Sequence, residues 1–209
     1  MARVVRRRSE ATKERILSAA LKLMARSGYH GAKTKAIATE AGVNEALIFR
    51  YFGSKKELLK ALIEKNRMAE TIAPFDKPKD YSLVSFLQAA ARSTFVAYEN
   101  NPDFFRLLRF TLLEEPDMLK DYFAHYSKNR LDPFLRFLAK ARQQGLIRGD
   151  LAPELQAQVF GGLLYHMLEQ RILGLNPLFS KLTVKASVDL VVDHFLQGSN
   201  PLAFRPSGK

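Results

Sequence analysis

The chain has 209 residues, of which 47% are hydrophobic and 26% charged, so it is long enough for one or two domains and too apolar for a wholly disordered protein. It has no cysteine, which excludes disulfides and thiolate metal sites and is typical of a reducing cytoplasm, where we expect the protein to work. The basic N-terminus leads into Ser9 and Glu10 rather than into an apolar run, and no long uncharged apolar stretch follows. We therefore expect neither a signal peptide nor a membrane span.

The net charge of +12 is concentrated in the first third of the chain. Residues 1–73 hold 16 lysines and arginines against 7 aspartates and glutamates, whereas the remaining residues hold 17 against 14. This asymmetry indicates a polyanionic partner for the first third, either nucleic acid or an anionic membrane surface. On charge alone, a basic solvated surface is an equally good interpretation.

Apolar residues at helical spacing predict four short helices in this basic third. The first helix ends at Gly28, and Thr34 is a suitable N-cap for the second. The four predicted helices cover residues 9–27, 34–41, 45–52 and 55–73.

Helix-boundary signals are densest in residues 42–59, around which the rest of the chain is organised. Gly42 suits the left-handed conformation that closes a helix, and Asn44 is a preferred N-cap for the next one. Ser54 and Glu57 form a capping box that opens the fourth helix. This order of glycine turn and caps predicts a helix-turn-helix whose second helix is residues 45–52.

The predicted helix over 45–52 has an inner and an outer side. Ile48 and Phe52 are four residues apart and should pack against the other helices. The outer side is then left for base edges in a major groove, and it holds Glu45, Ala46, Phe49 and Arg50. Arg50 suits guanine, Glu45 suits the cytosine amino group, and Phe49 suits a thymine methyl.

Groups suited to phosphate surround this side. The N-termini of the second and fourth predicted helices offer backbone N–H groups beside Lys35 and Lys55, and Tyr51 adds a hydroxyl. The predicted DNA-binding residues are therefore Thr34, Lys35, Asn44, Glu45, Ala46, Phe49, Arg50, Tyr51 and Lys55.

Residues 12–59 resemble the DNA-binding domain of the TetR family of transcriptional regulators. The agreement is densest in IATEAGV at 37–43 and in YFGSKKELL at 51–59. Three positions depart from the family pattern, because Glu45, Leu47 and Phe49 replace residues that are more often polar or basic. The resemblance implies a DNA-binding head, a fourth connecting helix, and a helical C-terminal domain that dimerises and holds a small effector.

The rest of the chain also reads as helical, so we expect an all-α protein of about nine helices. Further helices are predicted at 83–99, 103–115, 118–144, 154–173 and 184–196, and Pro133, with Asp132 as a plausible cap, either splits or kinks the third of these. Pro74 and Pro78 mark a boundary. We expect a helix-turn-helix domain with a basic arm at 1–54, a connecting helix and linker at 55–80, and an effector-binding and dimerisation domain at 81–209.

The C-terminal region is rich in aromatic rings, most of which must be ordinary core. Their number, together with a few polar side chains among them, favours a pocket for a hydrophobic compound with one polar end. The candidate pocket residues are Phe86, Phe105, Arg109, Tyr122, His125, Tyr126, Phe134, Tyr165, His166 and Glu169.

The last two long helices carry apolar seams and a Gly161-Gly162 pair that permits close approach of another backbone. As a homodimer interface we predict Val159, Gly162, Leu163, Met167, Val188, Val191 and Phe195. A symmetric dimer needs a near-palindromic double-stranded DNA site. The alternative is that these seams pack within their own domain.

These patterns favour a repressor that a small hydrophobic effector releases from its operator. A helical enzyme or metal protein is an alternative, but His166 and Glu169 form only one reversed pair where a di-metal bundle site needs two Glu-x-x-His pairs and more. A peripheral membrane protein is a second alternative, although the first helix has no aromatic anchor. We predict no catalytic residues, no cofactor and no metal.

Overall fold

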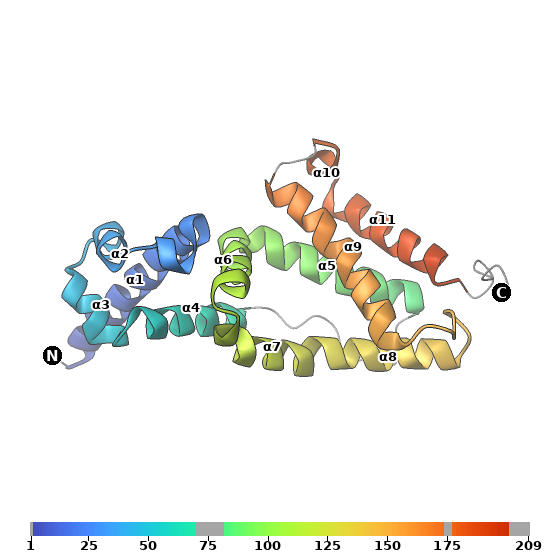
Figure 1. Ribbon diagram of the computed structural model, residues 1–209, viewed down its shortest axis with the longest axis horizontal. Coiled ribbons are helices and arrows are strands. Elements are labelled where there is room, and N and C mark those ends of the chain that lie inside the picture. The colour runs from blue at the N-terminus through green and yellow to red at the C-terminus, as the bar shows by residue number, and fades with distance from the viewer. Residues whose placement is uncertain (1, 70–81, 174–176, 201–209) are drawn as a thin grey trace. The chain divides into compact units, whose positions relative to one another are not determined.

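The computed structural model describes residues 2–69, 82–173 and 177–200, and the regular structure within these ranges is helical throughout (Figure 1). The elements are α1 (Ala2–Gly31), α2 (Thr34–Ala41), α3 (Glu45–Phe52), α4 (Lys55–Ala69), α5 (Leu83–Asn100), α6 (Pro102–Glu114), a 3₁₀ turn (Pro116–Leu119), α7 (Lys120–Tyr126), a π-helical segment (Ser127–Leu131), α8 (Asp132–Gln143), α9 (Pro153–Leu173), α10 (Pro177–Lys181) and α11 (Val184–Gly198). The predicted all-α class is confirmed. The predicted boundary around Pro74 and Pro78 lies outside the described residues.

The chain forms two compact units that do not follow the sequence in one cut. Unit 1 contains residues 1–70 and 101–124, and unit 2 contains residues 71–100 and 125–209. The helix α6 therefore belongs with α1–α4, although we predicted the domain boundary before it. In the described residues, no helix is long and apolar enough to cross a membrane.

Local sequence signals explain the ends of α2, α3 and α4. Gly42 has left-handed backbone angles (φ 62°, ψ 43°), and the Asn44 side chain accepts a hydrogen bond from the Ala46 N–H at 2.8 Å. The Ser54 hydroxyl accepts from the Glu57 N–H at 3.1 Å. The Gly42 turn and the Asn44 cap are confirmed, but only the Ser54 half of the predicted capping box forms, because the Glu57 carboxylate accepts from the Lys60 ammonium at 2.8 Å instead. These signals place α3 between two defined turns.

Two predictions at the start of the chain need correction. Helix α1 continues past Gly28 to Gly31, with a break at Gly28 where φ is 73°. Thr34 is not an N-cap, because the extended residue Lys33 holds that position and makes no side-chain capping bond. Thr34 is instead the first residue of α2.

Unit 1 has one hydrophobic core to which α6 contributes. Helix α1 packs against α2, α4 and, along much of its length, α6. Ile16 and Ile48 are fully buried in the same cluster as Phe104 and Leu107 of α6. The position of α2 and α3 is thus set by α6 as well as by their own contacts.

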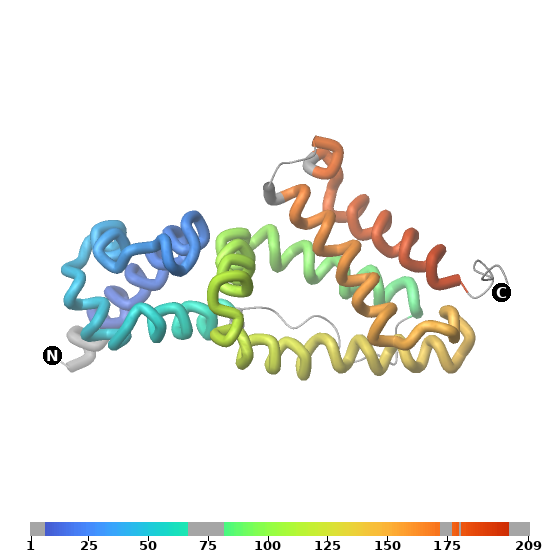
Figure 2. Tube along the Cα trace, in the orientation of Figure 1, coloured from blue at the N-terminus to red at the C-terminus, as the bar shows by residue number. Residues whose placement is uncertain are grey.

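Unit 2 is built around α5, α9 and α11, which pack on one another, while α8 packs on α9 (Figure 2). Phe86, Phe95 and Phe195 are buried in it, and the Phe195 ring lies 5.1 Å from that of Phe160 in an edge-to-face arrangement. Aromatic rings of this kind pack favourably edge to face.

The helical pattern predicted over 118–144 is interrupted just before Pro133, which is one of the two outcomes that we expected there. The 3₁₀ turn and α7 lead into a π-helical segment, Ser127–Leu131, before α8 begins at Asp132. Pro133 lies in the first turn of α8 and lacks the N–H that a continuous α-helix uses there, which explains why the helix changes its hydrogen-bonding pattern just before it. Asp132 does not cap α8; its side chain accepts from the Ser127 hydroxyl at 3.2 Å. The short α10 was not predicted.

Candidate nucleic-acid interface and ligand cavity

Helix α3 is held on one side and left open on the other. Ile48 is fully buried, and Phe52 packs partly buried against the core of unit 1. On the opposite side Ala46 and Arg50 are exposed, and 46% of the Phe49 surface remains accessible. The outer side of α3, with Ala46, Phe49 and Arg50, is therefore free to contact another molecule.

Two residues predicted to meet DNA separately are bonded to each other. The Thr34 hydroxyl at the start of α2 donates to the Glu45 carboxylate at the start of α3, with 2.5 Å between the oxygens. Glu45 also occupies the first turn of α3, where the helix dipole favours a negative charge. The helix dipole therefore stabilises the Glu45 carboxylate at this position, and the hydrogen bond from the Thr34 hydroxyl orients it.

Lys35, next to Thr34 on α2, and Arg50 on α3 are exposed. Within the described part of the chain neither forms an ion pair. Tyr51 is half-buried, with the Lys13 ammonium 5.9 Å from the centre of its ring. Exposed cations beside a helix N-terminus are suited to phosphate oxygens.

Lys55 lies in a more enclosed place than Lys35. Its ammonium sits 4.6 Å from the centre of the Tyr29 ring, a cation–π arrangement. Partial burial and the neighbouring charge of Lys33 hold the pKa of Lys55 below its ordinary value, and Glu114 opposes this shift. Burial, with a smaller effect from Glu115, raises the pKa of Tyr29.

Two carboxylates at the end of α6 meet the break in α1. The Glu114 carboxylate accepts the His30 backbone N–H at 3.0 Å, and the Glu115 carboxylate lies 3.1 Å from the His30 ring nitrogen Nε2. Gly28, at the break, has a φ of 73°, and a Cβ atom at this position would clash with the Glu114 carboxylate, so glycine is required there. No pattern in the sequence predicted this link between α1 and α6.

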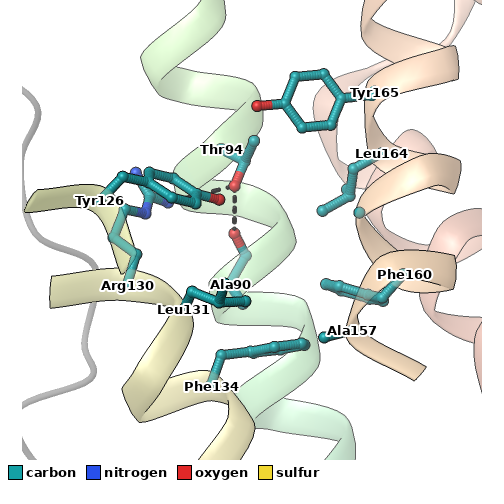
Figure 3. Close-up of a pocket in the computed structure, with 11 residues that line it drawn as sticks. Ala90, Thr94, Tyr126, Arg130, Leu131, Phe134, Ala157, Phe160, Leu164 and Tyr165 are labelled. Carbon is teal, nitrogen blue, oxygen red and sulfur yellow. Dashed lines mark hydrogen bonds between the residues drawn. The ribbon is translucent and has the colours of Figure 1, made fainter. Parts of the chain in front are cut away.

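A cavity of about 70 Å³ lies within unit 2 between α5, the π-helical segment and α9 (Figure 3). Figure 3 shows Thr94, Tyr126 and Arg130 on one wall and Phe160 and Leu164 opposite them. The lining residues are Ala90, Thr94, Tyr126, Arg130, Leu131, Phe134, Ala157, Phe160, Gly161, Leu164 and Tyr165.

The cavity brings together only some of the predicted pocket residues. Tyr126, Phe134 and Tyr165 line it, whereas Phe105, Arg109 and Tyr122 belong to unit 1. Phe86 is buried beneath it, its ring 3.7 Å from that of Phe137. His125 does not line the cavity, and its ring nitrogen Nδ1 lies 3.1 Å from the Asn129 amide. Glu169 lines neither this cavity nor the groove described next.

Arg130 is absent from the predicted pocket residues, although the sequence carries a signal for it. Tyr126, Arg130 and Phe134 follow one another at four-residue spacing, so an arginine interrupts an otherwise aromatic stripe. The small residues Ala90, Ala157 and Gly161, which leave the space open, gave no signal of their own.

A second, apolar hollow of about 420 Å³ lies along α9 and α11 of unit 2. We call it the α9/α11 groove; it is lined by Val159, Gly162, Leu163, His166, Met167, Phe179, Leu190, Val191 and His194. Five of the predicted interface residues therefore line it, and so does His166, which we assigned to the effector pocket. Val188 and Phe195 are buried in the core instead.

The described residues contain no cluster of three or more histidine, aspartate or glutamate side chains arranged to hold a metal ion.

Comparison with known proteins places residues 16–62, on α1–α4, in the family model "Bacterial regulatory proteins, tetR family". The HTH-type transcriptional repressor SCO4008 of Streptomyces coelicolor is 42% identical over 71 residues, which cover 34% of this chain and 37% of SCO4008. The HTH-type transcriptional regulator SrpR of Pseudomonas putida is 25% identical over 80% of this chain and 78% of its own length. The match to SCO4008 thus spans little more than a third of that relative.

Solved structures extend the similarity to both units. The fatty acid degradation regulator FadR from Bacillus halodurans has a TM-score of 0.68 at 21% identity, covering 93% of this chain and 97% of FadR. A TetR family transcription regulator from Marinobacter aquaeolei VT8 has a TM-score of 0.67 at 19% identity, covering 90% of this chain and 97% of its own. At these identities the similarity shows the fold alone.

Proposed function

Because this chain belongs to the TetR family of transcriptional regulators, we propose that it is a homodimeric repressor, released from a near-palindromic operator by a small hydrophobic effector. The observation that carries the proposal is the open side of α3. Phe49 is 46% exposed, and Arg50 beside it is exposed without an ion pair in the described residues, whereas the other side of α3 packs on the core of unit 1 through Ile48 and Phe52.

This open side suits a major groove. An α-helix fits into the groove, and an arginine can donate two hydrogen bonds to guanine O6 and N7. Lys35 and Lys55 flank α3 at the N-termini of α2 and α4, where phosphate oxygens meet backbone N–H groups. In this assignment Arg50, Phe49 and Glu45 read bases, while Lys35, Lys55 and Tyr51 position the head on the backbone.

The α9/α11 groove supports a homodimer. Val159 and Leu190 are 49% and 38% exposed there, and a Cβ atom added at Gly162 would meet no other atom of the chain within 4 Å. A long apolar hollow with an open glycine can receive a helix of a second copy. Two heads in one dimer would then meet successive major grooves, half-sites lying roughly 34–36 Å apart or more.

The order of elements along the chain suggests how an effector acts on the head. The chain enters unit 1 at Asn101 and leaves it after Ala124, and cavity residues stand on both sides of this stretch, Thr94 before it and Tyr126 after it. Helix α6 in this stretch packs along α1 and holds His30 through Glu114. An effector that shifts the ends of this stretch would therefore shift α1, and with it the spacing of two heads.

Selection of bound duplexes from a random pool tests the proposal, with and without candidate hydrophobic compounds. We expect a recovered near-palindrome, and we expect the cognate compound to reduce its retention. Recovery of duplexes without any shared sequence would overturn the assignment of α3 as a reading helix. A compound that tightens binding would indicate a co-repressor instead of an inducer.

Two variants separate reading from positioning on the recovered site. Arg50→Ala should relax the preference at one base pair of each half-site by about 1–3 kcal/mol. Lys55→Ala should weaken binding to all sequences about equally and reduce the salt dependence by about one phosphate contact per head. Arg92→Ala, an exposed position on α5 of unit 2, serves as the charge-matched control. The reverse pattern for Arg50 and Lys55 would refute these roles.

A further inference from the structure

Arg130 gives the cavity of unit 2 a charged end. Its guanidinium nitrogen Nη2 donates to the Ser93 hydroxyl at 3.1 Å and to the Thr94 hydroxyl at 3.3 Å. Its carbon Cζ lies 5.9 Å from the centre of the Tyr126 ring. In Figure 3 Arg130, Tyr126 and Thr94 stand together, and the Tyr165 hydroxyl points toward the same α5 wall.

Arg130 has no carboxylate partner in the described residues, whereas two comparable arginines of unit 2 each have one. Arg148 and Arg171, also largely enclosed in unit 2, each lie 2.5 Å from a carboxylate, that of Asp150 and that of Glu99. Across the described ranges, no carboxylate lies within ion-pairing distance of Arg130, whose partners are two neutral hydroxyls and a ring. A guanidinium carries five N–H donors in a planar fork that matches a carboxylate.

The π-helical segment is what brings Arg130 to this place. Segments of this kind are rare and occur often at functional sites, because they interrupt the regular helix at a cost in stability. Here the wider turn presents two consecutive residues, Arg130 and Leu131, to the cavity. Asn129 supports the turn by donating to the His125 carbonyl at 2.9 Å.

The remainder of the cavity is apolar and small. Phe134, Phe160 and Leu164 face the charged end, and the ring of Phe134 lies 5.3 Å from that of Phe160. The cavity has a volume of about 70 Å³ and is partly open to solvent, so it favours a ligand with a slim apolar body that reaches Arg130 from the open side.

We propose that the effector is an amphipathic organic carboxylate, whose anionic head takes two hydrogen bonds from Arg130 and whose small aromatic or aliphatic body packs against the stacked rings of Phe134 and Phe160 and against Leu164. This inference rests on the proposed function for the role of the ligand, but not for its chemistry. When the ligand binds, the Arg130 guanidinium exchanges two neutral acceptors for a charged one. A carboxylate therefore forms charge-assisted hydrogen bonds with Arg130 that an amide or an alcohol of the same shape does not form.

The test compares matched probes in direct binding to the full chain without DNA. Benzoate, phenylacetate, 4-phenylbutyrate, hexanoate and octanoate are each titrated by calorimetry beside the corresponding amide and amine. At least one carboxylate should bind about ten- to a hundredfold tighter than its amide, since hydrogen bonds to charged groups exceed neutral ones by this margin. Equal affinity of acid and amide, tighter binding of the amine, or no binding by any carboxylate at 10 mM overturns the inference.

Variants then assign the binding to Arg130. Arg130→Gln should remove about tenfold or more of the carboxylate affinity and leave the amide unchanged, whereas Arg136→Gln, an exposed arginine of α8, should change neither. If Arg130→Gln does not fold, Arg130→Lys decides instead: lysine keeps the positive charge but loses the planar fork, so the ratio of acid to amide affinity should fall severalfold. A ratio unchanged from that of the parent chain in either variant refutes the role of Arg130.

The same probes distinguish this inference from the proposed function. A carboxylate that binds through Arg130 but leaves operator binding unchanged supports the site and contradicts release by this ligand. A neutral compound that releases the operator with no effect of Arg130→Gln supports the repressor and overturns the carboxylate.

Discussion

The outer side of α3 and the cavity of unit 2 are opposite kinds of binding surface. The outer side of α3 is open and is fixed by the Asn44 cap and the Gly42 turn. The cavity is small, at about 70 Å³, and only partly open to solvent, and its walls come from three separate stretches of chain. A surface that meets a long rigid polymer is used as it stands, whereas a small cavity is reshaped by the molecule that fills it, and this reshaping can couple binding to a change elsewhere.

The largest expected effect tests whether α6 belongs with α3 rather than with the cavity. Phe104 on α6 is 1% exposed and lies in the core that holds Ile48. Phe104→Ala should destabilise unit 1 by about 3–5 kcal/mol, because it removes a ring and leaves a void. Hydrogen exchange should show faster exchange of α1 and α3 amides.

Phe110→Ala on the same helix is the control, since 36% of that side chain is exposed, and it should cost less than about 1 kcal/mol. Loss of amide protection in α9 and α11, with α3 unchanged, would mean that α6 belongs energetically to unit 2.

The next largest effect tests whether the α9/α11 groove forms the dimer interface that the DNA-binding head needs for tight operator binding. Gly162→Leu should leave the isolated chain folded, because a Cβ atom there meets nothing within 4 Å and leucine favours a helix by about 1 kcal/mol over glycine. A leucine in the α9/α11 groove should block a second copy. Sedimentation should then show a monomer, and operator affinity should fall about a hundredfold or more because the second half-site is no longer tethered.

Gln158→Leu, at an exposed position of α9 that does not line the groove, should leave both oligomeric state and operator affinity unchanged. A dimer that survives Gly162→Leu with full operator affinity would place the interface elsewhere.

The head was largely predictable from sequence because its signals are short-range. Gly42, Asn44 and Ser54 act on neighbours within three residues, so their caps and turns can be recognised without knowing the fold. Thr34 shows where this stops. Its hydroxyl makes no capping bond and donates instead to the Glu45 carboxylate, eleven residues away. Only the packing of α2 against α3 brings that carboxylate within hydrogen-bonding distance.

The second unit was predictable in its helices but not in its sites. Phe86 and Phe134 are equally good aromatic candidates by sequence, yet Phe86 is buried at 1% exposure while Phe134 lines the cavity. Which side of a helix faces a cavity depends on the crossing of α5 with α9, which no local pattern specifies. Gly161 and Gly162 show the same limit, since these neighbours line the cavity and the groove respectively.

A smaller effect tests whether Thr34 serves Glu45 or phosphate. If the 2.5 Å bond orients Glu45 for a base, Thr34→Val should reduce discrimination at one base pair of each half-site by roughly 1 kcal/mol and leave affinity for non-specific DNA unchanged. Thr39→Val, whose hydroxyl donates to the Lys35 carbonyl, is the matched control and should alter neither. A uniform loss of affinity for all duplexes would assign the Thr34 hydroxyl to phosphate instead.

The smallest effect concerns the acid stability of unit 2 and its partly exposed ion pair between Arg148 and Asp150. The hydrogen bond from Arg148 holds the pKa of Asp150 below its ordinary value of 3.8. Because this pKa is lower in the folded than in the unfolded chain, the pair stabilises the fold above about pH 4, and the stabilisation is lost as the pH falls through the folded-state value. Arg148 also donates its backbone N–H to the Ser199 carbonyl at 2.7 Å, so the pair helps to hold the loop between α8 and α9 against the end of α11.

The midpoint temperature of thermal unfolding of Asp150→Asn should therefore fall less steeply between pH 5 and pH 2 than that of the parent chain. The control is Asp193→Asn, which replaces an exposed aspartate of α11, and its midpoint temperature should fall as steeply as that of the parent chain. Identical slopes for all three chains would show that the pair does not contribute to the stability of unit 2.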